Sequence, residues 1–376
     1  MKSKINILRI VATPQGGIGG HVGELINSID HQKFSTILCT SLEAADNKFK
    51  LKLPDIQKNT KRIINLNIKK APSISDFLNI YKIYRICKND AVEIVHGHGA
   101  KGGVYARILG VFLKVKVIYS PHGGSLHAVH GLFGNFIYLL IERFLFYFTT
   151  LVVFDSDYCN SNFKSKLLIK SERLKTIFLG VVVKDKSQGR ISERNNIYII
   201  AIGQLRKLKG HDILIRAIKI LVKKGYKVKL GICGGGEKGL SFLNKLISDL
   251  ELHNIVTLYG DVAEISPYLD SADIFVHPSL HEAFGYAPIE AMNSGLPVIV
   301  SNVGGLLDIV KDEFNGLVFD IRGDNELNLS LAIESYINNP DLVKKVVNNA
   351  EFTIKSKFNI NRMIVEFENS YQEVLS

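Results

Sequence analysis

Short apolar runs alternate with longer helical stretches along most of the chain, and this rhythm constrains the fold more than any other feature of the sequence. The front half has five such runs, at residues 5–12, 35–40, 93–96, 115–120 and 151–154. The back half has five more, at residues 197–203, 227–233, 255–259, 272–277 and 297–301. Short apolar runs separated by helical patterns are typical of βαβ units. The sequence therefore predicts an α/β protein with parallel, doubly wound sheets.

The rhythm is interrupted once, by a polar and charged stretch at residues 184–196. A chain of 376 residues is too long for one typical hydrophobic core, and a hydrophobic content of 46% is enough for two. We therefore expect a first domain at residues 1–183, a linker, and a second domain at residues 197–355. The amphipathic pattern at residues 360–376 predicts a final helix.

Cysteine usage points to a reducing compartment. The four cysteines are scattered and form no C-x-x-C pair, which argues against a zinc ribbon or a disulfide framework. They are Cys39, Cys87, Cys159 and Cys233. The simplest location for such a chain is the cytoplasm.

The most apolar window, residues 132–154, is not expected to span a membrane. Glu142 and Arg143 lie in its middle, where each would be costly in lipid. We expect a buried or amphipathic helix followed by a strand at residues 151–154. Residues 5–12 are too short for a signal sequence and include Arg9, so they predict a first strand.

Positive charge is concentrated in the front half. Residues 1–180 contain 25 Lys and Arg against 12 Asp and Glu, whereas residues 181–376 contain 22 against 24. A basic face can attract anionic lipid headgroups or an acidic acceptor, and a solvated surface with phosphate-facing side chains explains the same excess. No recognition module or interleaved aromatic pattern supports binding to nucleic acid.

Two carboxylates lie across a junction between loop and helix in residues 277–301, HPSLHEAFGYAPIEAMNSGLPVIVS. Residues 272–277 predict a buried strand, and Pro288 fits the first turn of the helix that follows the loop. In open α/β sheets, ligands bind at the carboxyl ends of strands, and the N–H groups of a following helix attract phosphate. Glu282 in the loop and Glu290 about one turn into the helix are therefore candidate ligand-binding residues.

This segment resembles the Glu-x7-Glu motif of retaining GT-B glycosyltransferases of the family 4 type, which move a sugar from a nucleotide donor to an acceptor. The resemblance covers nearly the whole chain, through a glycine-rich loop, two histidine loops, two donor-side loops and a late strand. These motifs are PQGGIGGHVG at 14–23, VHGHGAKGG at 95–103, SPHGG at 120–124, IGQLRKLKG at 202–210, GICGGGE at 231–237 and NGLVF at 315–319. The resemblance implies two Rossmann-like domains with an interdomain cleft. The first would be the acceptor-side domain and the second the nucleotide-sugar donor-binding domain, with the C-terminal helix packing back on the first.

The resemblance also implies roles for residues in the segment 277–301. Glu282 would bind hydroxyls of the transferred sugar, and Glu290 would bind the ribose. Backbone N–H groups would bind the sugar and the diphosphate. These groups belong to Phe284, Gly285, Tyr286 and Ala287.

Lys209 is the best candidate to bind the diphosphate. Negative charge develops on the leaving group as the glycosidic bond breaks. Without a metal, cationic side chains and N–H groups at the start of a helix must stabilise this charge. Lys209 directly precedes a glycine and a predicted helix at residues 212–223. Family members usually have an arginine where this chain has Gln204, so Arg206 is our candidate replacement, with a solvated loop as the alternative for Arg206.

Glycines complete the expected donor contacts, because they let the backbone approach phosphate closely. Gly235 lies in the second donor-side loop, and Gly17, Gly19 and Gly20 follow the first predicted strand. A dinucleotide fingerprint, GxGxxG, would need a third glycine where the chain has Val22, so an NAD-dependent dehydrogenase is disfavoured.

Histidines mark the acceptor side. His122 matches the family histidine that contacts the transferred sugar, and we predict it to be catalytic together with Glu282 and Lys209. His98 and Lys101 are predicted to lie on the acceptor side. The spacing of His96 and His98 also suits a metal site, but no third ligand is evident in the sequence.

The triplet Asp155-Ser156-Asp157 offers a second metal hypothesis, because Asp-x-Asp after a strand holds the cation of GT-A enzymes. The triplet lies far in sequence from Glu282. We therefore expect no metal and no cofactor.

The sequence thus predicts a retaining glycosyltransferase that uses a nucleotide-sugar, with UDP as the expected nucleotide, and builds a cell-surface polysaccharide or glycolipid. Its acceptor would be a glycan or a lipid-linked molecule, and its location the cytoplasm, at the inner face of the membrane. By resemblance, the donor phosphate would help deprotonate the acceptor hydroxyl in a front-face substitution. A degenerate sugar-nucleotide binding protein and a GT-B sugar-nucleotide epimerase remain the alternatives.

Overall fold

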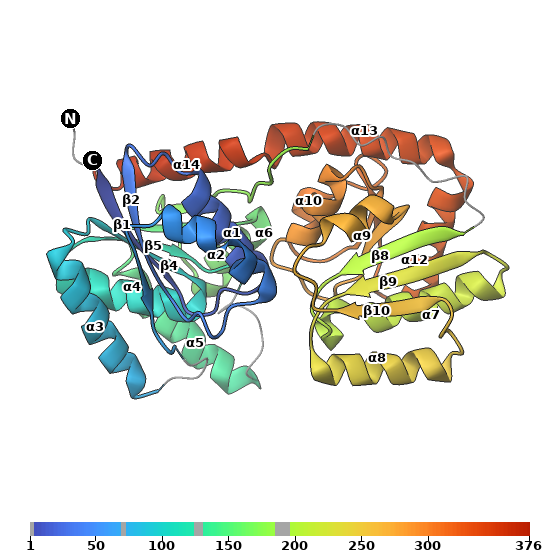
Figure 1. Cartoon of the computed structure of the whole chain (residues 1–376), viewed down its shortest axis with the longest axis horizontal. Coiled ribbons are helices and arrows are strands. Elements are labelled where there is room, and N and C mark those ends of the chain that lie inside the picture. Colours follow the sequence, from blue (N-terminus) through green and yellow to red (C-terminus); the bar gives the residue numbers. More distant parts are fainter. Residues whose placement is uncertain (1–3, 69–72, 124–130, 185–195) are drawn as a thin grey trace. The chain divides into compact units, whose positions relative to one another are not determined.

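The computed structural model describes residues 4–68, 73–123, 131–184 and 196–376, which form two α/β units (Figure 1). The first unit comprises Met1–Leu179 and Ile360–Ser376, and the second comprises Gly180–Asn359. The second unit begins before residue 184, because Val181 forms a β-bridge with Asn359 and the Lys184 amide donates to the side chain of Asn293. The expected linker at residues 184–196 lies almost entirely outside the described residues.

The first unit contains a seven-stranded sheet in which every pairing is parallel, in the order β3-β2-β1-β4-β5-β6-β7. The strands are β1 (Ile5–Val11), β2 (Phe34–Thr40), β3 (Arg62–Asn65), β4 (Ile94–His98), β5 (Lys116–Ser120), β6 (Leu151–Phe154) and β7 (Leu174–Thr176). The order reverses direction between β1 and β4, so the carboxyl ends of these strands lie at a topological switch point.

Helices cover both faces of this sheet. They are α1 (Gly16–Ser28), α2 (Asn47–Lys58), α3 (Ser75–Asn89), α4 (Gly99–Leu113), α5 (Gly131–Phe146), α6 (Asp157–Leu167) and the C-terminal α14 (Ile360–Glu373). One core joins α1 and α2 to the strands, and a second joins α3 and α4 to the opposite side chains of the strands. Helix α14 is tied to the first unit where the Asp30 amide donates to Glu368 and the Arg9 guanidinium donates to the Tyr371 hydroxyl.

The second unit contains a six-stranded parallel sheet in the order β10-β9-β8-β11-β12-β13. The strands are β8 (Ile197–Ile202), β9 (Val228–Cys233), β10 (Val256–Gly260), β11 (Ile274–His277), β12 (Val298–Ser301) and β13 (Leu317–Phe319). The helices are α7 (His211–Lys223), α8 (Glu237–Asp249), α9 (Ser266–Ser271), α10 (Tyr286–Asn293), α11 (Leu306–Ile309), α12 (Asn325–Asn338) and α13 (Pro340–Lys357). Side chains of Asp324 and Asn339 cap α12 and α13, which accounts for where these helices begin.

The predicted fold class is confirmed, because each unit is a Rossmann-like domain built on one parallel sheet. Strands β3 and β7 were not predicted, because each is an edge strand of three or four residues with half-exposed or exposed positions. Within the described ranges, no helix combines the length and apolarity needed to cross a membrane.

Candidate functional site

Three loops meet at the carboxyl edge of the second sheet and are packed tightly against one another. A Cβ on Gly210 would lie 2.0 Å from the carbonyl oxygen of Pro278, and a Cβ on Gly234 would lie 1.8 Å from that of Gly203. The Leu280 amide donates to the carbonyl of Leu208, which joins the loop after β8 to the loop after β11. Only glycine fits at these crossings, so the sequence fixes how closely the loops approach.

Glu282 is the centre of a polar network formed by two of these loops. Its Oε2 accepts from Lys209 Nζ at 2.5 Å and from His277 Nε2 at 2.9 Å, and the Ser279 hydroxyl donates to it at 3.4 Å. The structure thus joins Lys209 and Glu282, two residues that the sequence assigned to one site. The contribution of His277 was not predicted, although its position at the end of β11 is a usual place for a ligand-binding side chain.

The charges and hydrogen bonds around Glu282 and His277 determine which of the two is ionised. Burial alone raises the pKa of Glu282, but the charge of Lys209 and the hydrogen bond from His277 outweigh it and hold this pKa well below its ordinary value. Burial lowers the pKa of His277, so its ring is neutral and Nε2 carries the proton that Glu282 accepts. The site therefore presents one ammonium group and one carboxylate in direct contact.

The loop after β11 leads into α10, where the remaining predicted carboxylate lies. Gly285, with φ of 116°, occupies the N-cap of α10, and no side chain caps this helix start. Phe284 is buried against the ring of Phe358, and Tyr286 donates its hydroxyl to the carbonyl of Gly180. Ala287 and Glu290 are half-buried in α10.

Arg206 and Gly235 lie at the same edge of the sheet. Arg206 is exposed and precedes the short 3₁₀ turn Lys207–Lys209, in which the Lys209 amide donates to the Arg206 carbonyl. The Gly235 carbonyl accepts from the Leu205 amide, so Gly235 holds the two donor-side loops together. Gln204 occupies the position at which the resemblance implies an arginine. It is exposed and lies two residues before Arg206.

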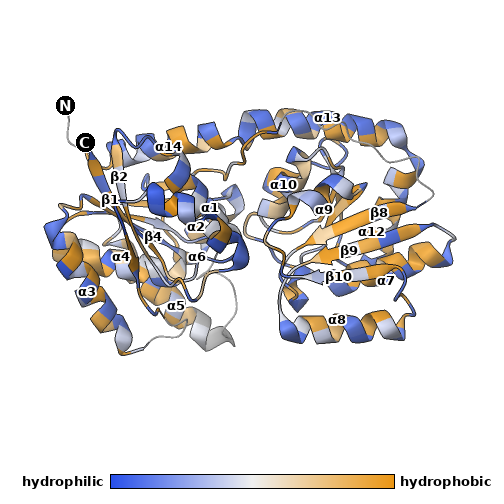
Figure 2. Ribbon diagram, in the orientation of Figure 1, coloured by the Kyte–Doolittle hydropathy of each residue, from blue (hydrophilic) through white to orange (hydrophobic). Residues whose placement is uncertain are grey.

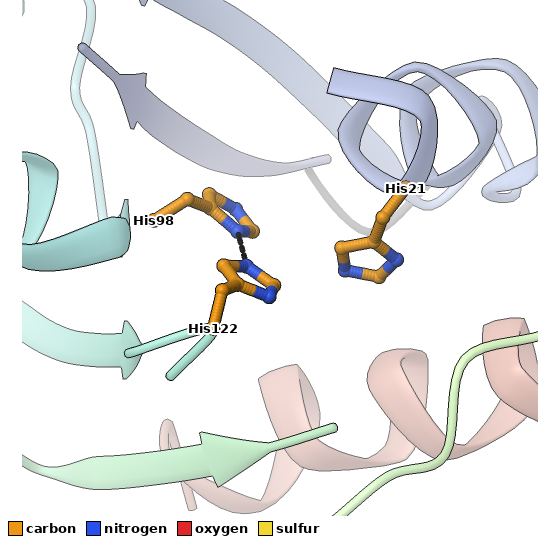
Figure 3. Close-up of side chains that lie close together, drawn as sticks. All are labelled: His21, His98 and His122. Carbon is orange, nitrogen blue, oxygen red and sulfur yellow. Dashed lines mark hydrogen bonds between the residues drawn. The ribbon is translucent and has the colours of Figure 1, made fainter. Parts of the chain in front are cut away.

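The first unit brings three histidines together at the carboxyl ends of its strands (Figure 3). His98 ends β4, His122 follows β5, and His21 comes from α1. The rings of His98 and His122 are stacked at 5.4 Å, with Nδ1 of His98 3.1 Å from Nε2 of His122. His122 has φ of 50°, a conformation that residues other than glycine rarely adopt, so its ring is held in place at the expense of backbone strain.

Asp155 sets the protonation of this pair. Its Oδ2 lies 3.4 Å from Nδ1 of His122, so the proton of His122 lies on Nδ1 and its Nε2 accepts from His98. Nε2 of His98 then carries a lone pair, and this atom is buried with no hydrogen-bond partner among the residues that the structure describes. Asp155, from the triplet weighed as a metal ligand, orients a histidine instead, while Ser156 caps α6 and Asp157 lies in its first turn.

His21 supplies the third ligand that the sequence did not reveal for a metal site. One ligand atom each from His21, His98 and His122 lies within 4.8 Å of the others, and both ring nitrogens of His21 are buried without a hydrogen-bond partner in the described part of the chain. Burial lowers the pKa values of His21 and His98 well below their ordinary range, with the charge of Arg9 acting in the same direction. Neutral imidazoles suit zinc, whereas the positive charge of Arg9 opposes a second cation.

Three predicted residues lie differently from expectation. Gly17, Gly19 and Gly20 belong to α1 and not to a loop; Gly19 is needed because a Cβ there would lie 2.9 Å from the Pro14 carbonyl oxygen. The Gly16 amide already donates to Asp46 at 2.6 Å. A carboxylate from the protein therefore lies at the start of α1, where we expected a phosphate.

The acceptor-side candidate Lys101 and the metal candidate His96 both have partners within the first unit. Lys101 forms an ion pair with Asp76 of α3 at 2.9 Å. His96 is fully buried, with Arg9 and Tyr371 at its Nδ1 and Ser120 at its Nε2. His96 therefore serves the core of the first unit.

Two known protein families match this chain, one in its front half and one in its back half. Residues 15–185 match the family described as "Glycosyltransferase Family 4", and residues 183–352 match "Glycosyl transferases group 1". The chain is a glycosyltransferase with the GT-B fold.

Relatives of this glycosyltransferase include enzymes of bacterial polysaccharides. It is 26% identical to the capsular polysaccharide biosynthesis glycosyltransferase CapM of Staphylococcus aureus, over 80% of this chain and 82% of that one. It is 25% identical to the UDP-Gal:alpha-D-GlcNAc-diphosphoundecaprenol alpha-1,3-galactosyltransferase of Escherichia coli, over 80% and 81%. Among solved structures, Anabaena HepE in complex with UDP and glucose aligns with a TM-score of 0.83 at 20% identity, over 98% of this chain and all of that one.

Proposed function

We propose that this glycosyltransferase is a retaining enzyme that transfers a sugar from a UDP-sugar to a glycan or lipid-linked acceptor during the synthesis of a cell-surface polysaccharide. The names of the relatives support this proposal, since one acts in capsule biosynthesis and another uses UDP-galactose and a diphosphoundecaprenol-linked acceptor. The bound UDP and glucose of HepE support the choice of UDP.

The contact between Lys209 and Glu282 carries the proposal. Lys209 is a cation at the carboxyl edge of the second sheet, where it can bind a diphosphate and meet the charge that develops on the leaving group. Glu282 is a carboxylate beside it, suited to accept hydrogen bonds from sugar hydroxyls. Glu290, about one turn into α10, is proposed to bind the ribose, and N–H groups at the start of this helix to bind the sugar and the diphosphate.

In this mechanism the new glycosidic bond forms on the face from which the nucleotide leaves. The acceptor hydroxyl gives its proton to an oxygen of the departing diphosphate, and Lys209 stabilises the negative charge on that diphosphate. His122, with its proton held on Nδ1 by Asp155, is proposed to contact the transferred sugar. No step requires a metal ion.

The acceptor class also suggests a location. A lipid-linked acceptor is held in a membrane, so we propose that the enzyme acts at the cytoplasmic face of the membrane. The four cysteines are all buried and unpaired, which suits a reducing compartment.

The experiment that tests the proposal combines donor binding with product analysis, with EDTA present throughout. Calorimetry with UDP, GDP, ADP, their common sugar conjugates and NAD identifies the nucleotide, and we expect UDP to bind. Transfer to an undecaprenyl-diphosphate-linked GlcNAc, followed by NMR of the anomeric proton, gives the stereochemistry, and we expect retention. Inversion would contradict the mechanism; conversion of the UDP-sugar without an acceptor would indicate an epimerase, and binding without release of UDP would indicate a binding protein.

The ribose assignment has its own test. Glu290→Ala should weaken UDP binding by about 2 kcal/mol, the scale of a charged hydrogen bond, but should leave the affinity for 2′,3′-dideoxy-UDP unchanged. Glu326→Ala, which removes an exposed carboxylate paired with Arg216, is the matched control. An equal loss for both nucleotides would refute the assignment.

A further inference from the structure

Helix α5 exposes more large apolar side chains than an ordinary surface helix, although it also buries Leu145 and Phe146. Its buried face holds Glu142, which accepts from Arg107 at 2.9 Å and from the Tyr119 hydroxyl at 3.2 Å. Its outer face exposes a stripe of large apolar side chains with helical spacing. These are Phe136, Ile137, Leu140, Ile141 and Phe144, exposed by 58%, 40%, 52%, 45% and 62%. The apolar window that the sequence assigned to a buried or amphipathic helix therefore has apolar side chains on its exposed side as well as on its buried side.

The apolar surface continues onto the helices beside α5. Helix α4 contacts α5 through the Arg107–Glu142 pair, and α3 packs on α4, where Tyr84 and Phe112 are in ring contact. Figure 2 shows hydrophobic residues along both α3 and α5. The exposed apolar side chains of α3 and α4 are Phe77, Leu78, Tyr81, Val111 and Phe112. Monomeric proteins rarely expose so many large apolar side chains on neighbouring elements unless they form an interaction site.

The exposed charges on these three helices have one sign. Among the described side chains of these three helices and their caps, the exposed charged residues are all basic: Lys82, Arg85, Lys88, Lys114 and Arg143. The acidic residues of these helices are turned inward, because Asp76 pairs with Lys101 and Glu142 with Arg107. Apolar side chains surrounded by Lys and Arg are typical of segments that lie in the interface of an anionic bilayer.

We propose that the outer face of α3, α4 and α5, termed the docking face, inserts its apolar side chains into the headgroup region of an anionic lipid bilayer. A second copy of the chain fits less well, since two docking faces would bring like charges together. The docking face rests on the exposure and charge of these helices; only its purpose, reaching a lipid-linked acceptor, rests on the proposed function. None of its residues belongs to the donor site of the second unit.

The test measures binding of the full chain to phosphatidylcholine vesicles with and without phosphatidylglycerol, by co-sedimentation. Phe136→Ser combined with Phe144→Ser should reduce the partition coefficient at least about tenfold, since each phenyl ring contributes apolar area that water no longer contacts. The matched control combines Phe242→Ser with Phe352→Ser, two phenylalanines exposed by 52% and 67% in the second unit, and should bind as the wild type does. Lys82→Gln combined with Lys88→Gln should lower binding only when phosphatidylglycerol is present, by about fivefold for each lysine.

UDP binding, measured by calorimetry on every variant, separates this proposal from the proposed function and reports that the variants are folded. Vesicle binding lost with UDP affinity unchanged supports the docking face. Vesicle binding that is unaffected by the docking-face variants, or equally lost in the control, would overturn the proposal. Analytical ultracentrifugation showing a wild-type dimer that Phe136→Ser with Phe144→Ser dissociates would overturn it in favour of self-association.

Discussion

Replacing Lys209 with alanine should weaken UDP binding by about 10- to 150-fold. The Lys209 ammonium lies 2.5 Å from Glu282, and the Lys209 side chain is 26% exposed, so it is accessible to a diphosphate. A hydrogen bond to a charged group contributes about 1.5–3 kcal/mol, which corresponds to that range of affinity. The assay is calorimetric titration with UDP in EDTA. Lys224→Ala is the matched control, because Lys224 forms a similar ion pair, with Glu334 at 2.7 Å, away from the site.

The counterpart variant, Glu282→Gln, should separate the nucleotide from the sugar. Without the carboxylate, Lys209 keeps its charge and loses its partner, so affinity for UDP should stay the same or rise. Glu282 is proposed to bind sugar hydroxyls, so the advantage of a UDP-sugar over UDP should shrink and transfer should fall. An unchanged UDP affinity in Lys209→Ala, or an equal loss for UDP and UDP-sugar in Glu282→Gln, would refute the reasoning.

Three further predictions concern the carboxylates Glu282, Glu142 and Asp155. Because the folded-state pKa of Glu282 lies below its ordinary value of 4.5, the stability that its ionised form contributes is present above about pH 4.5 and is lost as the pH falls. Acid unfolding of Glu282→Gln, followed by circular dichroism, should therefore depend less steeply on pH than that of the wild type. Glu142→Ala leaves Arg107 buried without its partner and should lower the free energy of unfolding by about 3–5 kcal/mol in urea titrations, while replacing both residues by Leu and Met should restore much of it. Asp155→Asn replaces the carboxylate with an amide that can either accept from or donate to Nδ1 of His122, so the His122 proton is no longer fixed and transfer should fall while UDP affinity stays constant. Unchanged transfer would show that His122 needs no orientation.

Much of the donor-side arrangement could be predicted from the sequence because it is local. The strand β11, the loop with Glu282 and the start of α10 lie within about twenty consecutive residues, and glycine and proline mark their boundaries. Lys209 comes from a different loop, and its assignment to the same site as Glu282 rested on the resemblance to GT-B glycosyltransferases. The contact is physically reasonable, because parallel strands present their carboxyl ends at one edge of the sheet.

Other contacts could not be predicted, because they join residues far apart in the chain. His21 and His98 are buried near each other only because α1 lies over the ends of β4 and β5, and nothing in the local sequence of α1 distinguishes His21 from an ordinary helix residue. Asp155 was seen as half of an acidic motif, whereas its distance from His122 depends on the pairing of β5 with β6. The exposure of the apolar side chains of α5 could not be predicted either. The sequence alone suggests that Glu142 is a surface charge, whereas in the structure it is buried and bonded to Arg107.

The histidine cluster of the first unit is better suited to a hydroxyl group than to a metal ion, and charge is the reason. The Arg9 guanidinium donates to the Tyr371 hydroxyl and lies 3.3 Å from His96, whose ring contacts that of His98 with the centroids 4.0 Å apart. No carboxylate pairs with Arg9 in the described structure. Burial is the main cause that lowers the pKa of His98, and the positive charge of Arg9 acts in the same direction. That charge disfavours a divalent cation for the same reason that it disfavours a proton. A neutral imidazole with Nδ1–H donating to His122 offers a lone pair at Nε2, which suits a hydroxyl donor. We therefore expect transfer to persist in EDTA, and loss of activity on chelation, restored by zinc in the wild type but not in His21→Ala, would reverse this assignment.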